Sequence, residues 1–157
     1  MSQTVSMAIR TASEDKLYER ETLHHIGFVV SSIANAAPGF LAASELEWDE
    51  KVFHDPIQTV QVTFLKHRCP GTPMIELVEP TSPTSRINAF LKRGGGLHHL
   101  CYEVDSLAKR LKYALSQGSI LLIEPSPAPA FGLRPIAWVC TREKLLIEYL
   151  QRDISAV

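Results

Sequence analysis

The chain has 157 residues, 45% of them apolar, which is enough for one compact domain or two small fused modules. Its 16 basic and 17 acidic side chains give a formal charge of −1, so no electrostatic attraction to nucleic acid or to an anionic membrane is expected. The longest strictly apolar runs are about five residues, far below the ~20 that a membrane-spanning helix needs.

Residues 1–22 are polar and mixed, and they lack the apolar stretch of a secretory signal. We interpret them as an N-terminal extension, either without regular structure or as a short surface helix. The three cysteines, Cys69, Cys101 and Cys140, are widely spaced and odd in number, which argues against a disulfide framework. A cytoplasmic location is therefore expected.

From residue 23 the pattern predicts an ordered succession of elements. Residues 23–30 alternate like a strand, and the serines that follow suit the cap of a helix that contains Pro38. In the first half we expect a strand over residues 23–30 and a helix over residues 31–44. Three strands follow, over residues 47–53, 57–67 and 73–79, and then a capped helix that runs into glycines, over residues 81–96.

The second half repeats this order. A strand is followed by a helix that ends at Gly118, then by three strands, over residues 97–104, 105–118, 119–124, 136–140 and 143–151. A proline-rich segment, 125–135, is typical of the lid or rim of an active site.

The two halves are also similar in sequence. Residues 23–42 align with 97–116, so that a double histidine opens each half, and Glu76 aligns with Glu148. This pattern indicates a duplicated βαβββ unit. The predicted organisation is one domain over residues 23–152, with module one at 23–92 and module two at 97–152.

Strand alternation places one histidine and one glutamate of each half on a common face. In residues 23–30 the apolar side chains should face the helix, which leaves His25 opposite, and His99 follows by the same argument. Glu76 and Glu148 likewise lie opposite the apolar residues of their strands. Two imidazoles and two carboxylates suit a divalent ion such as Zn²⁺, Co²⁺, Ni²⁺ or Mn²⁺, with positions left for water or substrate.

A single histidine or glutamate on a strand is usually a structural or solvated residue. Here both residue types recur at matching places in the two halves, and this coincidence favours a metal site. The preceding histidines, His24 and His98, are expected to pack against the helix layer or to support the ligands as hydrogen-bond donors.

The duplication with its His-Glu-His-Glu set resembles the vicinal oxygen chelate superfamily, which is the glyoxalase and bleomycin-resistance fold. Within residues 23–152 the stretch "MIELVEPTSPTSRINAFLKRGGGLHHLCYEVDSL" is most similar to methylmalonyl-CoA epimerases. The resemblance implies an α+β fold in which two tandem βαβββ modules form an open, cup-like, eight-stranded mixed sheet with helices outside. It also implies that His25, Glu76, His99 and Glu148 hold the metal.

The same resemblance implies an enzyme, a metal-dependent epimerase or isomerase that acts through an enolate on an acyl-CoA or a similar 2-substituted thioester. Glu148 and Glu76 are the candidates for proton transfer, and a homodimer is expected. The epimerases are also expected to carry a further acid on the strand at 57–67, where this chain has Gln61 and Thr63.

Two other functions remain open. A glyoxalase I-type lyase, which acts on a thiol hemiacetal, would use the same four ligands. A non-catalytic module that binds a small molecule usually lacks them. Two basic clusters are candidates to contact the phosphates of a CoA ligand, although a solvated charged surface is commoner: Lys66, His67 and Arg68, and Arg86, Lys92 and Arg93. Arg134, at the end of the proline-rich segment, is a candidate to meet a substrate carboxylate.

Overall fold

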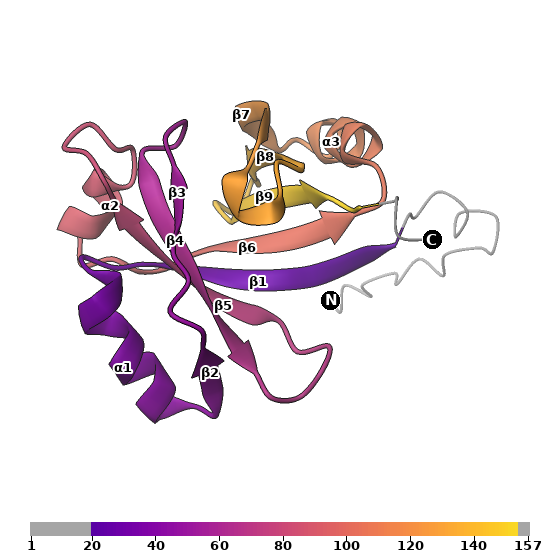
Figure 1. Ribbon diagram of the computed structural model, residues 1–157. Coiled ribbons are helices and arrows are strands. Elements are labelled where there is room, and N and C mark those ends of the chain that lie inside the picture. The colour runs from indigo at the N-terminus through magenta and orange to yellow at the C-terminus, as the bar shows by residue number, and fades with distance from the viewer. Residues whose placement is uncertain (1–19, 154–157) are drawn as a thin grey trace, which may run out of the picture.

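The computed structural model describes residues 20–153, and the expectations for residues 1–19 lie outside this range. The described chain forms one open mixed sheet that carries two longer helices and one short helix (Figure 1). Within the described range, no helix combines the length and the apolar character needed to cross a membrane.

The first half contains five strands and one long helix: β1 (Glu21–Val29), α1 (Ile33–Ala43), β2 (Leu46–Trp48), β3 (Phe53–Asp55), β4 (Val60–His67) and β5 (Met74–Pro80). A short helix, α2 (Asn88–Lys92), connects it to the second half. The second half contains β6 (Gly96–Val104), α3 (Leu107–Ser116), β7 (Ile120–Pro127), the 3₁₀ turn η1 (Pro129–Phe131), β8 (Pro135–Cys140) and β9 (Leu146–Gln151).

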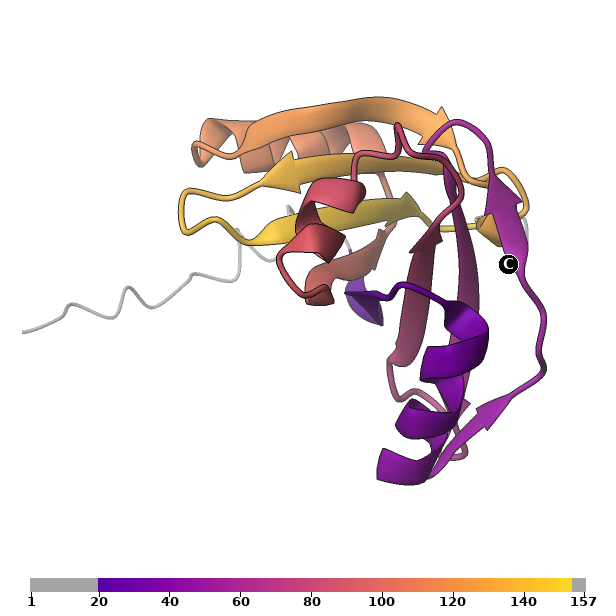
Figure 2. The ribbon, with the colours of Figure 1, turned by 90° about the vertical axis from the view of Figure 1, so that its left-hand side faces the viewer.

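The nine strands form one sheet in the order β2-β4-β5-β1-β6-β9-β8-β7, with β3 paired to β4 beside β2. The halves meet where β1 runs antiparallel to β6. On either side of this junction each strand pairs in parallel with the last strand of its own half, β1 with β5 and β6 with β9. The duplicated unit predicted from the sequence therefore builds two similar halves of one open sheet, and Figure 2 shows them set at an angle to each other.

The single strand predicted over residues 47–53 is wrong. The chain forms β2, leaves the sheet and returns as β3, and Glu50 between them has a φ of 59°, which a strand cannot accommodate. Since β2 and β3 both pair with β4, the sheet gains a ninth strand without a change of topology.

Helices α1 and α3 cover one face of the sheet. The serine cap predicted for the first helix is confirmed, since the hydroxyl of Ser32 accepts the backbone N–H of Asn35. Helix α3 begins in the same way, with the hydroxyl of Ser106 accepting the backbone N–H of Lys109. The apolar side of α1 packs on β4 and β5, and that of α3 packs on β6, β8 and β9. We call the opposite face, which carries Val29, Val62 and Phe64, the inner face.

The helix predicted over residues 81–96 is much shorter than expected, because α2 spans only Asn88–Lys92. The preceding residues form turns that are held by their own polar side chains. The amide of Asn88 donates to the carbonyls of Ser82 and Pro83, and the hydroxyl of Ser82 accepts from the backbone of Thr84. Such local bonds compete with a helix and delay its start.

The three cysteines should differ sharply in reactivity in the folded protein. Cys69 is exposed, whereas Cys101 is fully buried and its burial raises the pKa of the thiol. Brief alkylation followed by peptide mass spectrometry should label Cys69 and leave Cys101 unmodified until denaturant is added. Rapid labelling of Cys101 in the native protein would contradict the packing described above.

Candidate metal centre

Two β-bulges lie in the pairing of β1 with β6, one in each strand. The pairing skips His24 in β1 and His98 in β6, so each double histidine contains one residue without a cross-strand partner. A bulge bends the strand and redirects the side chains around it. The bulges therefore let both histidines of each pair approach the inner face.

The expectation that His24 and His98 pack against the helix layer is wrong for this reason. His24 lines one cavity with Phe64, and His98 lines another with His99. Their Nδ1 atoms lie 2.9 Å and 3.0 Å from the Nδ1 atoms of His25 and His99. This is hydrogen-bond distance, which agrees with the alternative that the first histidines hold the second ones in place.

The four predicted ligands converge at the junction of the two halves. The Nε2 atoms of His25 and His99 are 3.2 Å apart. Glu76 Oε2 lies 3.4 Å from His25 Nε2 and 3.3 Å from His99 Nε2, and Glu148 Oε2 lies 3.4 Å from His25 Nε2. All four residues are at most 5% exposed.

The sheet register explains why these side chains meet. Gly27 in β1 is the partner of His99 in β6, and the imidazole of His99 occupies the space where a side chain at residue 27 would lie. A Cβ at that position would overlap the ring. The absence of a side chain at Gly27 therefore permits His99 to approach His25.

Burial and mutual attraction set the charges of this cluster. Burial by itself would lower the pKa of His25, but the charge of Glu76 beside it raises that pKa to about 9. Burial would raise the pKa of Glu76, and the charge and hydrogen bond of His25 hold it below its usual value instead. In the absence of a metal, the cluster therefore places a protonated imidazole between two carboxylates.

The pKa values of His24 and His98 are shifted in the opposite direction from that of His25. Burial, together with the charge of the histidine that follows each of them, lowers the pKa of both to about 4. Both imidazoles are therefore neutral near pH 7, as is required of rings that support charged neighbours.

The donor set fits a divalent cation. Donor atoms of His25, His99 and Glu148 lie within 4.8 Å of one another, and Glu76 Oε2 is close to both imidazoles. Among the described residues, buried Glu148 Oε2 has no hydrogen-bond partner. A buried carboxylate oxygen that accepts no hydrogen bond is costly, and a bound cation would remove this cost. Two neutral imidazoles and two carboxylates are typical ligands of Zn²⁺ and its neighbours.

A cavity of about 390 Å³ opens from this cluster, and we call it the apolar cavity. Glu76, His99 and Glu148 contribute to its wall, and its other polar residues are Gln58, Arg86 and His98. The rest of its lining is hydrophobic: Ile57, Val60, Val62, Val78, Ile87, Leu122, Ile123, Trp138 and Leu146. Its volume is within the range of small-molecule sites.

The wall formed by β4 is hydrophobic. The epimerases are expected to carry a further acid on this strand, where the sequence has Gln61 and Thr63, and β4 presents Val60 and Val62 to the apolar cavity. The hydroxyl of Thr63 is bound to the carbonyl of Lys51. Among the described residues that line the cavity, the carboxylates are Glu76 and Glu148 alone.

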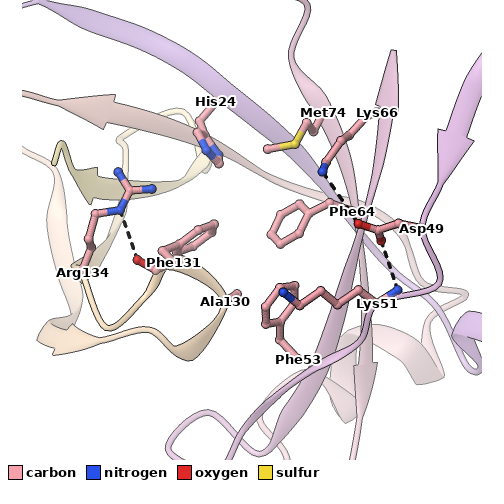
Figure 3. Close-up of a pocket in the computed structure, with 10 residues that line it drawn as sticks. All are labelled: His24, Asp49, Lys51, Phe53, Phe64, Lys66, Met74, Ala130, Phe131 and Arg134. Atoms are coloured by element: carbon pink, nitrogen blue, oxygen red, sulfur yellow. Dashed lines mark hydrogen bonds and ion pairs between the residues drawn. The ribbon is translucent and has the colours of Figure 1, made fainter. Parts of the chain in front are cut away.

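The structure has a second cavity of about 250 Å³, and we call it the aromatic cavity (Figure 3). The proline-rich segment borders it through Phe131, which stacks on His25 with a centroid distance of 5.8 Å. This agrees with the rim predicted from the composition. Arg134, a candidate for a substrate carboxylate, donates instead to Glu103 at 2.6 Å. The lining is His24, Asp49, Lys51, Phe53, Phe64, Lys66, Met74, Ala130, Phe131 and Arg134.

Three residues at the site were not singled out from the sequence. Phe131 and Trp138 pack on His25 and His99, and Gly27 makes room for His99. Both aromatic residues come from the hairpin of β7 and β8, whose position depends on tertiary structure. Only Gly27 left a signal, as a glycine inside a predicted strand, which often marks a close approach.

The model of the glyoxalase/bleomycin resistance protein/dioxygenase superfamily matches residues 24–138. The chain belongs to this superfamily. Two relatives bear no assigned activity. YqjC of Bacillus subtilis is 33% identical to this chain over a region that covers 77% of this chain and 84% of YqjC. The structure of hypothetical protein BH1468 from Bacillus halodurans has a TM-score of 0.75 and 29% sequence identity, and the match covers 88% of this chain and 99% of that chain.

Methylmalonyl-CoA epimerases are also among the relatives. The mitochondrial enzyme of Dictyostelium discoideum is 34% identical over 67 residues, which are 41% of this chain and 40% of that protein. The structure of the Mycobacterium tuberculosis enzyme has a TM-score of 0.72 and 24% identity, and covers 85% of this chain and 89% of its own. These likenesses establish an epimerase-like fold.

Substitution of Gly27 by alanine should displace His99 and destabilise the protein by about 1–3 kcal/mol, as overpacking typically does. Gly39→Ala is the matched control, since a Cβ there meets no atom within 4 Å. Because Gly39 lies inside α1, that change should leave stability unaltered or increase it. Urea unfolding monitored by circular dichroism measures both. Equal stability of the two variants would contradict the role assigned to Gly27.

Proposed function

We propose that the protein is a divalent-metal-dependent epimerase or isomerase that moves a proton beside the carbonyl of an acyl-CoA or a similar 2-substituted thioester. The observation that carries this proposal is the convergence of four side chains, three of which line the apolar cavity. His25 meets Glu76, His99 and Glu148, and the last three belong to the cavity wall. The partial similarity to the Dictyostelium methylmalonyl-CoA epimerase supports a thioester as the substrate class.

The four residues would hold the ion through their Nε2 and carboxylate oxygen atoms. A bound Zn²⁺, Co²⁺, Ni²⁺ or Mn²⁺ would supply positive charge that stabilises the negative charge developing on a substrate carbonyl oxygen. His24 and His98 would hold the two imidazoles through their Nδ1 atoms, as they do in the structure. Trp138, packed against the His99 ring, would keep water from that side.

Proton transfer would fall to Glu148 and Glu76. A base must remove the proton on the carbon beside the carbonyl, and an acid must return one to the opposite face to invert the centre. The apolar cavity has no third carboxylate among its described lining residues, because β4 contributes valines there. Glu148 and Glu76, each through an oxygen that remains free of the ion, would therefore divide the two steps. One carboxylate would accept the proton, and the other, protonated beforehand, would return one to the opposite face.

The lack of a third carboxylate in the wall formed by β4 is also compatible with a second candidate function, a glyoxalase I-type lyase. Such a lyase, which acts on the hemiacetal of a thiol and methylglyoxal, would use the same four residues. Turnover of the glutathione hemiacetal without any reaction of thioesters would favour this lyase. Tight binding of a small molecule without turnover would favour a non-catalytic binding protein.

Protein purified without a polyhistidine tag should contain about one divalent ion per chain by inductively coupled plasma mass spectrometry. Glu76→Ala and Glu148→Ala should each lose most of it, whereas Glu124→Ala, an exposed residue of β7, should retain it. Chelation should lower the thermal midpoint, because an ion that binds only the folded state stabilises it. Metal-free wild-type protein, or unchanged metal content in both site variants, would refute the metal centre.

Incubation of methylmalonyl-CoA with the metal-loaded protein in D₂O should introduce deuterium at the carbon beside the thioester carbonyl. Glu148→Gln should slow this exchange about 10²- to 10⁴-fold, since an amide cannot accept the proton. Mass spectrometry of the recovered thioester gives the rate. If wild-type protein and buffer show the same exchange, the epimerase proposal fails for this substrate.

A further inference from the structure

Arg86 differs from the other basic residues near the connector between the halves in its contact with the apolar cavity. The sequence groups it with Lys92 and Arg93, but only Arg86 lines the apolar cavity. The guanidinium of Arg93 lies over the ring of Phe90 instead, 5.7 Å from its centroid. Among the described lining residues, Arg86 is the only lysine or arginine.

The position of Arg86 in the cavity is at the solvent side. Its side chain is exposed, as are those of Ile57 and Leu122 in the same lining, whereas Glu76 and Glu148 are at most 5% exposed. Within the described part of the chain, Arg86 makes neither a hydrogen bond nor an ion pair. Its charge is therefore not neutralised by the two carboxylates at the buried end.

The backbone around Arg86 is fixed in place. Ser85, immediately before it, is 5% exposed, and its N–H donates to the carbonyl of Ser82. Asn88 ties the following residues to the same turn through the carbonyls of Ser82 and Pro83. Ile87, next in the chain, is itself part of the cavity wall. The turn therefore needs no rearrangement of its backbone for the Arg86 side chain to meet a ligand in the cavity.

The lining of the cavity thus combines a buried His-Glu cluster, hydrophobic side chains such as Val60, Val62 and Val78, and one exposed cation that makes no ion pair. We propose that Arg86 binds an anionic group of the substrate, a carboxylate or a phosphate, and that the site therefore selects anionic thioesters over neutral ones. This inference rests on the proposed function. Guanidinium groups suit it, because they bind both anions through two parallel hydrogen bonds.

Equilibrium binding to the metal-loaded protein tests this inference without requiring turnover. Three probes separate the two sources of negative charge. Methylmalonyl-CoA carries both the carboxylate and the phosphates. Methylmalonyl-pantetheine lacks the phosphates, and isobutyryl-CoA has a methyl group in place of the carboxylate. Isothermal titration calorimetry gives the dissociation constants for wild type, Arg86→Gln and Arg86→Lys.

Arg86→Gln should weaken binding of methylmalonyl-CoA about 10- to 100-fold, the range expected for a hydrogen-bonded ion pair. If Arg86→Gln binds methylmalonyl-pantetheine more weakly by the same factor, then Arg86 binds the substrate carboxylate. If Arg86→Gln binds isobutyryl-CoA more weakly but binds the pantetheine ester as wild type does, then Arg86 binds a phosphate of the CoA. Arg86→Lys should recover part of the affinity, because it restores the charge but not the paired hydrogen bonds.

Arg93→Gln is the matched control, since Arg93 is a nearby basic residue outside the cavity lining, and it should bind all three probes like wild type. Circular dichroism should show both glutamine variants folded. If wild type binds the thioesters and Arg86→Gln binds them equally well, the role of Arg86 is refuted and the proposed function stands. If wild type binds no thioester, the proposed function fails, and the inference fails with it.

Discussion

The antiparallel pairing of β1 with β6 is the contact on which the rest of the structure depends. It joins the two halves of the sheet, and it brings the imidazoles of His25 and His99 to 3.2 Å from each other. The parallel strands beside it, β5 and β9, then add one glutamate each to the same place. A site at this junction requires both halves, so neither βαβββ unit could form it alone.

A cluster of two glutamates and two histidines at most 5% exposed is expensive to desolvate. The surrounding packing keeps the cluster in position: Phe131 stacks on His25, Trp138 packs on His99, and the helices hold the sheet from its opposite face. Glu148 Oε2 lies 3.4 Å from His25 Nε2, yet it accepts no hydrogen bond from any described residue. A buried oxygen without a hydrogen bond is typical of sites that are completed by a ligand or an ion.

Much of the fold could be predicted because it follows from local, repeated patterns. The alternation of β1, the serine cap of α1, and the recurrence of His-His and Glu at matching places each appear in a few consecutive residues. The predictions failed where a distant partner or a local polar network decided the conformation. The break at Glu50 and the turns that shorten α2 are of this kind, and so are the bulges at His24 and His98, which exist only as a relation between two strands.

The sequence by itself determined the duplication and the identity of the four residues that converge, because strand periodicity assigns each side chain to a face. The open mixed sheet followed from the resemblance of these motifs to a known superfamily. Tertiary structure alone decided what surrounds the four residues. The bulges brought His24 and His98 to the inner face, register placed Gly27 beneath His99, and the turn before α2 set Arg86 at the cavity while Arg93 stayed outside. These outcomes depend on which strands and loops meet across the sheet, and periodicity along one segment contains no information about that.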